Sequence, residues 1–208
     1  MKHILRIILD TIFPPSTHER LLREWTPKKF SEHLYPTLIA PHLALSHYEK
    51  PSVQAAIAAC KFENNMYAAK LLSALLQMWL EQNSSPGITI LIPLPLSIAR
   101  KKERGFNQVE RVIHYLSHDT HLKIEPSLLI RKQHTIRQTS LNRNQRLKNM
   151  PGAFRASEHI LLQDWNGISR VIICDDVLTT GATLTAARNT LSPHLPASVE
   201  LVTLAWAH

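Results

Sequence analysis

Hydrophobic positions repeat with the period of an α-helix in three segments of the chain. One stripe consists of Val53, Ala56, Ile57 and Cys60, and another of Met66, Ala69, Leu72, Leu76, Trp79 and Leu80. A third segment, 107–116, shows the same period less regularly. Spacings of three and four residues place apolar side chains on one helical face, so we predict three helices that pack against a core.

Short, continuous apolar runs follow turn signals elsewhere in the chain. The clearest are residues 88–92, 171–174 and 199–204, which are rich in Ile, Val and Leu. Runs of this kind are typical of strands buried on both faces of a parallel sheet. Residues 122–130 predict a further strand, although Pro126 interrupts it because proline cannot donate to a strand ladder.

Helices that alternate with buried strands predict an α/β fold with a central, mostly parallel sheet flanked by helices. The 208 residues fit one domain, with room for a small N-terminal element. The first 50 residues contain five prolines and little periodicity. We expect them either to wrap the core or to form a separate element.

The composition is that of a globular protein, with 44% hydrophobic and 19% charged residues. No apolar stretch approaches the roughly 18 residues of a membrane span. The longest apolar run near the N-terminus is residues 7–9, too short for a secretory signal. We therefore expect a cytoplasmic protein without membrane insertion, in which Cys60 and Cys174 are reduced and buried.

The net charge of +8 is concentrated in one part of the chain. Residues 97–148 hold 12 Lys and Arg but only 4 Asp and Glu, whereas the remainder is balanced. Such a basic block favours an anionic partner, either the phosphate groups of a small ligand or a nucleic-acid backbone. A solvated loop face is the alternative that composition alone leaves open.

The most informative motif is Val-Ile-Ile-Cys-Asp-Asp-Val-Leu-Thr-Thr-Gly-Ala-Thr at residues 171–183. A buried strand delivers Asp175 and Asp176 to its carboxyl end, where open α/β sheets bind their ligands. Residues 179–183 then form a small-residue turn into a helix, whose apolar stripe includes Leu184, Ala187 and Leu191. Free amides at that helix start, together with threonine hydroxyls, form a cradle for phosphate, and Gly181 permits close approach.

Two adjacent carboxylates beside a phosphate cradle need a neutral or cationic partner. Ribose hydroxyls and a magnesium ion meet this requirement, so the motif indicates a ribose 5-phosphate group. The alternative is a solvated strand end followed by an ordinary helix cap. The unbroken order of four apolar residues, two acids and Thr-Thr-Gly-x-Thr favours the ligand site.

The block at 171–183 resembles the phosphoribosyl-diphosphate (PRPP) motif of type I phosphoribosyltransferases. Other segments are similar to the ComF family of competence proteins, which includes the GntX-like proteins. They are Pro93-Leu-Pro95, Arg104-Gly-Phe-Asn-Gln108, Gln138-Thr-Ser-Leu141, Arg146-Leu-Lys-Asn149 and Gly152-Ala-Phe154. The resemblance covers about residues 45–208 and implies a type I phosphoribosyltransferase-like domain at 46–208.

The resemblance also implies roles for individual residues. The catalytic positions Asp175 and Asp176 would hold the ribose hydroxyls of PRPP and its Mg²⁺, with no metal held by the protein alone. The 5-phosphate would lie on Thr179, Thr180, Gly181, Ala182 and Thr183. A loop that faces diphosphate would contribute Arg100, Lys101, Lys102 and Arg104. A mobile loop that closes over the ligand, or contacts nucleic acid, would contribute Arg137, Gln138, Arg143, Arg146 and Lys148.

The chain departs from the family pattern near its N-terminus. Many ComF proteins carry a zinc module of paired CxxC motifs there, but this sequence has no cysteine before Cys60. We therefore expect no zinc, and we expect residues 1–45 to form an N-terminal extension without zinc-ligand cysteines.

Three functions follow from the resemblance and remain open at the level of sequence. The first is a role in DNA uptake during natural transformation, with single-stranded DNA and competence-machinery proteins as partners. The second is an active phosphoribosyltransferase of nucleotide salvage or metabolism, in which a nitrogen nucleophile displaces diphosphate from PRPP. The third is a PRPP-responsive regulator. No acceptor pocket is recognisable, so the sequence leaves open whether catalysis occurs.

Overall fold

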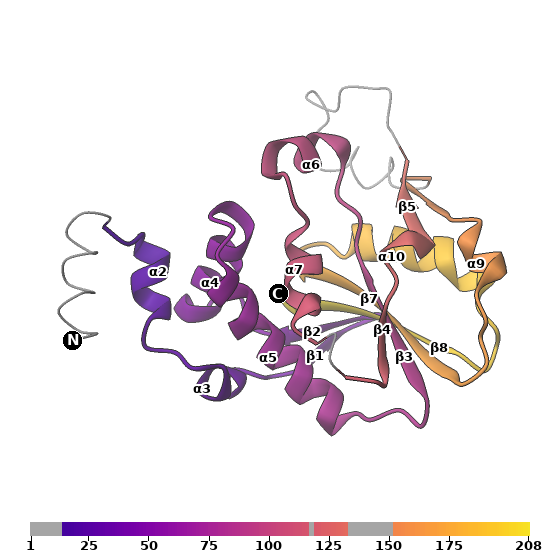
Figure 1. The fold of residues 1–208 in the computed structure, drawn as a ribbon, viewed down its shortest axis with the longest axis horizontal. Coiled ribbons are helices and arrows are strands. Elements are labelled where there is room, and N and C mark those ends of the chain that lie inside the picture. The colour runs from indigo at the N-terminus through magenta and orange to yellow at the C-terminus, as the bar shows by residue number, and fades with distance from the viewer. Residues whose placement is uncertain (1–13, 117–118, 133–151) are drawn as a thin grey trace.

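The computed structural model describes residues 14–116, 119–132 and 152–208 (Figure 1). The helices in these ranges are α2 (Thr17–Leu22), α3 (Pro27–Ser31), α4 (Pro51–Phe62), α5 (Met66–Gln82), α6 (Ile98–Arg104), α7 (Gln108–His114), α9 (His159–Leu162) and α10 (Ala182–Leu191). The strands are β1 (Thr37–Ile39), β2 (His42–Ser46), β3 (Ile88–Pro93), β4 (Leu122–Ile124), β5 (Leu129–Arg131), β6 (Phe154–Ala156), β7 (Ile168–Val177) and β8 (Glu200–Ala207).

Six strands form one sheet in the order β1-β2-β8-β7-β3-β4. Every neighbouring pair is parallel except β1 and β2, which are antiparallel. The three predicted buried runs are β3, β7 and β8, which are consecutive in the interior of the sheet. This confirms the predicted class, an α/β fold with a central, mostly parallel sheet flanked by helices.

The predicted strand over 122–130 is divided at Pro126, the residue that was expected to interrupt it. β4 joins the main sheet beside β3, whereas β5 pairs with β6 in a separate two-stranded antiparallel sheet. Pro126 begins a turn of 3₁₀-helix over Pro126–Leu128 between them. Because proline has no N–H to donate, the ladder of β4 cannot continue through this position.

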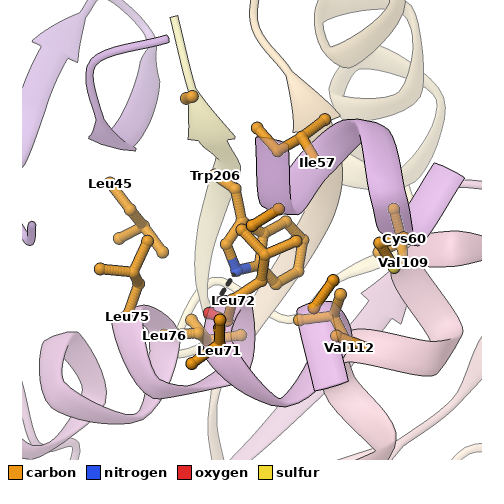
Figure 2. Packing of buried hydrophobic residues seen from close by; sticks show 14 of the residues in the cluster. Leu45, Ile57, Cys60, Leu71, Leu72, Leu75, Leu76, Val109, Val112 and Trp206 are labelled. Carbon is orange, nitrogen blue, oxygen red and sulfur yellow. Dashed lines mark hydrogen bonds between the residues drawn. The ribbon is translucent and has the colours of Figure 1, made fainter. Parts of the chain in front are cut away.

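Helices cover both faces of the sheet and create two hydrophobic cores. In β7, Ile172 and Cys174 contribute to the core beneath α4, α5 and α7, whereas Val171 and Ile173 contribute to the core beneath α10. Alternation of side chains along a strand explains this division. Figure 2 shows the first core, in which the Trp206 indole N–H donates a 2.9 Å hydrogen bond to the Leu72 carbonyl.

The helices over 51–62, 66–82 and 108–114 confirm the three periodic segments. Asn65 starts α5 because its side chain accepts a 3.0 Å hydrogen bond from the Ala68 N–H, which satisfies one donor of the first turn. Cys60 and Cys174 are buried and unbridged, as expected. Within the described residues, no helix combines the length and apolar character needed to cross a membrane.

The described part of the N-terminal region contacts the sheet and its helices. β2 lies parallel to β8, with Leu43 opposite Leu204, and α2 packs against α4. β2 spans residues on both sides of the predicted division between 45 and 46. That division stays a prediction about domains.

Candidate functional site

Asp175 and Asp176 lie near the carboxyl end of β7, between β8 and β3. Asp175 is opposite Ala205 of β8, and both acids are half-buried. The exposed fraction of the Asp176 side chain is only 16%. The strand therefore brings two adjacent carboxylates to the edge where parallel sheets bind ligands, but in a partly dehydrated setting.

Asp176 is held by side chains from the α4 and α7 layer. Its Oδ2 lies 2.8 Å from the Lys61 ammonium and accepts a 2.6 Å hydrogen bond from the Gln108 side-chain amide. The Oε1 of the Gln108 side chain in turn accepts a 3.0 Å hydrogen bond from Arg104. This chain of contacts connects Asp176 to the last residue of α6.

Asp175 is held by the backbone of its neighbour. Its Oδ1 accepts a 2.8 Å hydrogen bond from the Asp176 N–H. Burial, followed by the negative charge of Asp176, raises the pKa of Asp175 from 3.8 to about 7, although Lys61 and Arg100 act in the opposite direction. The two acids therefore differ: Asp176 is paired with a cation, whereas Asp175 titrates near neutral pH.

Residues 179–183 form the turn that starts α10, as predicted. Gly181 adopts a left-handed conformation with φ of 71° and provides no side-chain cap. The Thr180 hydroxyl accepts a 3.4 Å hydrogen bond from the Ala182 N–H. The other amides of the first turn have no partner within the helix, so they are available to an anion. Asp175 and residues 178–184 line one small pocket at this turn.

His42 supports this turn from β2, and sequence reasoning missed it. Its Nδ1 lies 2.7 Å from the Thr203 hydroxyl and its Nε2 lies 2.8 Å from the Thr185 hydroxyl on α10. A Cβ at Gly181 would lie 2.7 Å from the His42 ring carbon Cδ2. Glycine is therefore required at position 181 both for its positive φ and for the close approach of this ring.

The residues predicted to face diphosphate divide into two groups. Arg100, Lys101 and Lys102 are exposed on α6, which projects away from the sheet in Figure 1. Arg100 lies close enough for its charge to lower the pKa of Asp175. Arg104 instead turns inward, where it donates to Gln108 and its guanidinium lies 5.5 Å from the Phe62 ring centre. Arg104 thus supports Asp176 through Gln108.

Arg131 is a further cation at the site that sequence reasoning did not select. It ends β5, stacks over the Phe154 ring and donates a 3.4 Å hydrogen bond to the Pro95 carbonyl. Burial and the nearby charge of Arg100 lower its pKa, while Asp175 raises it. Arg100 and Arg131 therefore both lie within electrostatic reach of Asp175. The sequence contained no signal for Arg131, because only the pairing of β5 with β6 places it.

The predicted mobile-loop residues Arg137, Gln138, Arg143, Arg146 and Lys148 lie outside the described residues. In the ranges that the structure describes, no group of three or more His, Cys, Asp or Glu side chains is placed to hold a metal ion. The acidic pair offers two carboxylates, one of which is already paired with Lys61. A divalent ion would fit here if most of its oxygen ligands came from a bound substrate.

A cavity of about 380 Å³ lies at the amino ends of the strands, on the side of the sheet opposite to the candidate site. It is lined by the amino ends of β3, β4 and β7, including Thr89, Leu122 and Arg170. Arg170 is already paired with Glu200 at 2.7 Å. None of the predicted site residues lines this cavity, and ligands of parallel sheets bind at the carboxyl edge, so it is separate from the candidate site.

Comparison with known proteins confirms the predicted resemblance at the level of sequence. Competence protein F of Haemophilus influenzae is 29% identical over 146 residues, which are 67% of this chain and 61% of that protein. DNA utilization protein YhgH of Salmonella typhi is 30% identical over 137 residues, 64% of this chain and 58% of that protein. The chain thus spans about three fifths of the length of these relatives.

No family model matches the chain. A solved structure described as the allosteric regulatory enzyme of purine biosynthesis covers 84% of this chain and 30% of its own length, with 12% identity and a TM-score of 0.34. That likeness is too distant to add to the description of the fold.

Replacement of Gly181 by alanine tests the contact with His42. Gly105 is the control, since its φ of 74° is equally positive but no heavy atom lies within 4 Å of its added Cβ. We expect Gly105→Ala to lower the free energy of unfolding by about 1 kcal/mol through backbone strain, and Gly181→Ala by at least about 2 kcal/mol. Urea denaturation measures both, and equal losses would show that the His42 contact costs nothing.

The raised pKa of Asp175 predicts a pH dependence of stability. Because its folded pKa of about 7 exceeds the unfolded value near 4, the folded state binds more protons between these values, and stability falls as pH rises through this window. We expect the free energy of unfolding to fall less between pH 5 and pH 8 in Asp175→Asn than in wild type. The control Asp164→Asn, which changes an exposed acid, should show the same fall as wild type. Urea midpoints at both pH values measure this; identical losses in wild type and Asp175→Asn would contradict it.

Proposed function

We propose that this protein binds PRPP or a related ribose phosphate at the carboxyl edge of the sheet and acts in the handling of incoming DNA. One observation supports this ligand: Asp175 and the start of α10, to which Gly181 provides no side-chain cap, line the same pocket. The site therefore offers acceptors for hydroxyl groups beside donors for a phosphate. A ribose 5-phosphate presents both kinds of group, with the sugar hydroxyls on the acids and the phosphate on the turn.

Each part of the site has a distinct task in this proposal. The amides and hydroxyls of residues 179–183 bind the 5-phosphate, because the start of a helix attracts anions. Asp175 and Asp176 orient the ribose by accepting hydrogen bonds from its hydroxyls. Mg²⁺ would arrive with PRPP and neutralise part of its diphosphate.

A transferase reaction is a second candidate, favoured by the cations near Asp175. Arg100 and Arg131 both lie within electrostatic reach of this acid. Positive charge at this place would stabilise a departing diphosphate, while the acids hold the ribose in position. The acceptor would be a nitrogen nucleophile.

The DNA role is supported by the names of the relatives and by the exposed cations. One relative is named for competence and the other for DNA utilization, and the chain covers about three fifths of each. Arg100, Lys101 and Lys102 are exposed on α6, a helix with no buried residue. A projecting basic helix is suited to contact the phosphates of a single strand.

Calorimetric titration with Mg-PRPP tests the ligand site. We expect wild type to bind in the micromolar range and Asp175→Asn with Asp176→Asn to lose at least tenfold in affinity, because the ribose hydroxyls lose charged acceptors. The control carries Glu158→Gln with Asp164→Asn, which removes the same charge from two exposed acids. Absence of binding by folded wild type, or equal binding by all three proteins, would refute this site.

The DNA role predicts that α6 contributes to the salt dependence of binding. We expect weaker binding to single-stranded DNA when three residues are changed together, in the variant Arg100→Gln, Lys101→Gln, Lys102→Gln. The slope of log affinity against log salt concentration should become shallower by about two, because each lost phosphate contact removes roughly 0.7. Exposed Lys28, Lys70 and Lys123, changed to Gln together, form the control. Fluorescence anisotropy across a salt series measures the slope, and an unchanged slope would remove α6 from the DNA interface.

A further inference from the structure

A lysine from another layer of the fold lies against the acidic pair. Lys61 is the penultimate residue of α4, and its ammonium is 2.8 Å from Asp176 Oδ2. The exposed fraction is 19% for the Lys61 side chain and 16% for the Asp176 side chain. Contacts between exposed charges are often incidental, but this pair is largely withdrawn from water, so removal of one partner leaves the other charge uncompensated.

The hydrophobic core fixes the position of Lys61. The preceding residue, Cys60, is 2% exposed, and its thiol donates a 3.9 Å hydrogen bond to the backbone carbonyl of Gln108. Figure 2 shows Cys60 beside Val109 in this core, and both residues line a small apolar void together with Gln108 and Asp176. The end of α4 is therefore packed directly under the acidic pair.

The two acids differ in their contacts. Oδ2 of Asp176 is occupied by Lys61 and by the Gln108 amide, at 2.8 and 2.6 Å. Asp175 carries no such cation in direct contact among the described ion pairs, and it lines the pocket with the phosphate turn. Asp175 thus lines the pocket at the turn, whereas Asp176 has its Oδ2 engaged within the protein and only its other oxygen left for a ribose hydroxyl.

We propose that Lys61 is a resident counter-ion of the acidic pair, which allows the site to bind a phosphorylated ribose without a divalent cation at Asp176. The ligand class includes ribose 5-phosphate, which lacks a diphosphate to carry a metal. Two carboxylates beside a phosphate repel it unless a cation intervenes, and Lys61 supplies that cation from within the fold. This inference rests on the proposed ribose-phosphate site.

Metal binding without any sugar tests the counter-ion directly. Electron paramagnetic resonance distinguishes free from bound Mn²⁺ and so measures the Mn²⁺ affinity of each protein. The proteins compared are wild type, Lys61→Met, Lys61→Arg and a control at an exposed lysine, Lys70→Met. We expect Lys61→Met to bind Mn²⁺ at least tenfold more tightly than wild type, because it frees an Asp176 oxygen, and the gain to vanish when Asp176→Asn is added. Lys61→Arg and Lys70→Met should resemble wild type. A Lys61→Met protein with wild-type Mn²⁺ affinity would overturn the proposal.

Ligand binding in a chelator supplies the second readout. With EDTA present, we expect calorimetry to show ribose 5-phosphate binding to wild type and at least tenfold weaker binding to Lys61→Met. Mg²⁺ should restore most of the PRPP affinity of that variant. Equal binding of ribose 5-phosphate by both proteins would overturn the counter-ion role.

The two proposals fail in different ways. If wild type binds neither PRPP with Mg²⁺ nor ribose 5-phosphate, the ribose-phosphate site is wrong and the inference falls with it, whatever the Mn²⁺ result. If wild type binds PRPP only with Mg²⁺, the site stands and the resident counter-ion is wrong. Lys61→Gln provides a second neutral variant should Lys61→Met unfold, and urea denaturation establishes that each protein is folded.

Discussion

The ion pair between Lys61 and Asp176 connects the site to the rest of the molecule. Two adjacent carboxylates near the end of an interior strand lose much of their hydration, and this loss must be offset by cations or hydrogen bonds. Lys61 of α4 and Gln108 of α7 provide both for Asp176. The helices over one face of the sheet thus stabilise the site as well as the core, because their packing sets the positions of these two side chains.

The opposite face supports the phosphate turn. α10 packs there through Leu184, Ala187 and Leu191, and its first turn is braced by His42 from β2. His42 bridges hydroxyls on β8 and α10, so the strand that precedes most of the fold in sequence helps to position the turn that follows β7. The acids and the turn are adjacent in sequence, yet they depend on different layers of the structure.

Short-range pattern was sufficient to predict the helices α4, α5, α7 and α10, the interior strands β3, β7 and β8, and the residues of the candidate site. It did not predict β1, β2 and β6 or the short helices α2, α3, α6 and α9. The helical stripes and the buried β-branched runs reflect periods of a few residues, and the structure has helices and interior strands at these places. Asp175, Asp176 and residues 179–183 were also readable, because a strand, two acids and a helix start follow one another without interruption. Even the break at Pro126 was predicted, since it depends on one missing N–H.

The sequence by itself therefore determined the elements that have a clear helical period or a continuous apolar run, and which residues stand at the end of β7. Only the tertiary structure decided their partners. Lys61 meets Asp176 across 115 positions, and His42 meets Thr185 across 143, because sheet order and helix packing bring distant segments together. Periodicity carries no information on such pairings: it specifies which face of an element is buried, whereas the strand order and the neighbouring layers specify what that face contacts.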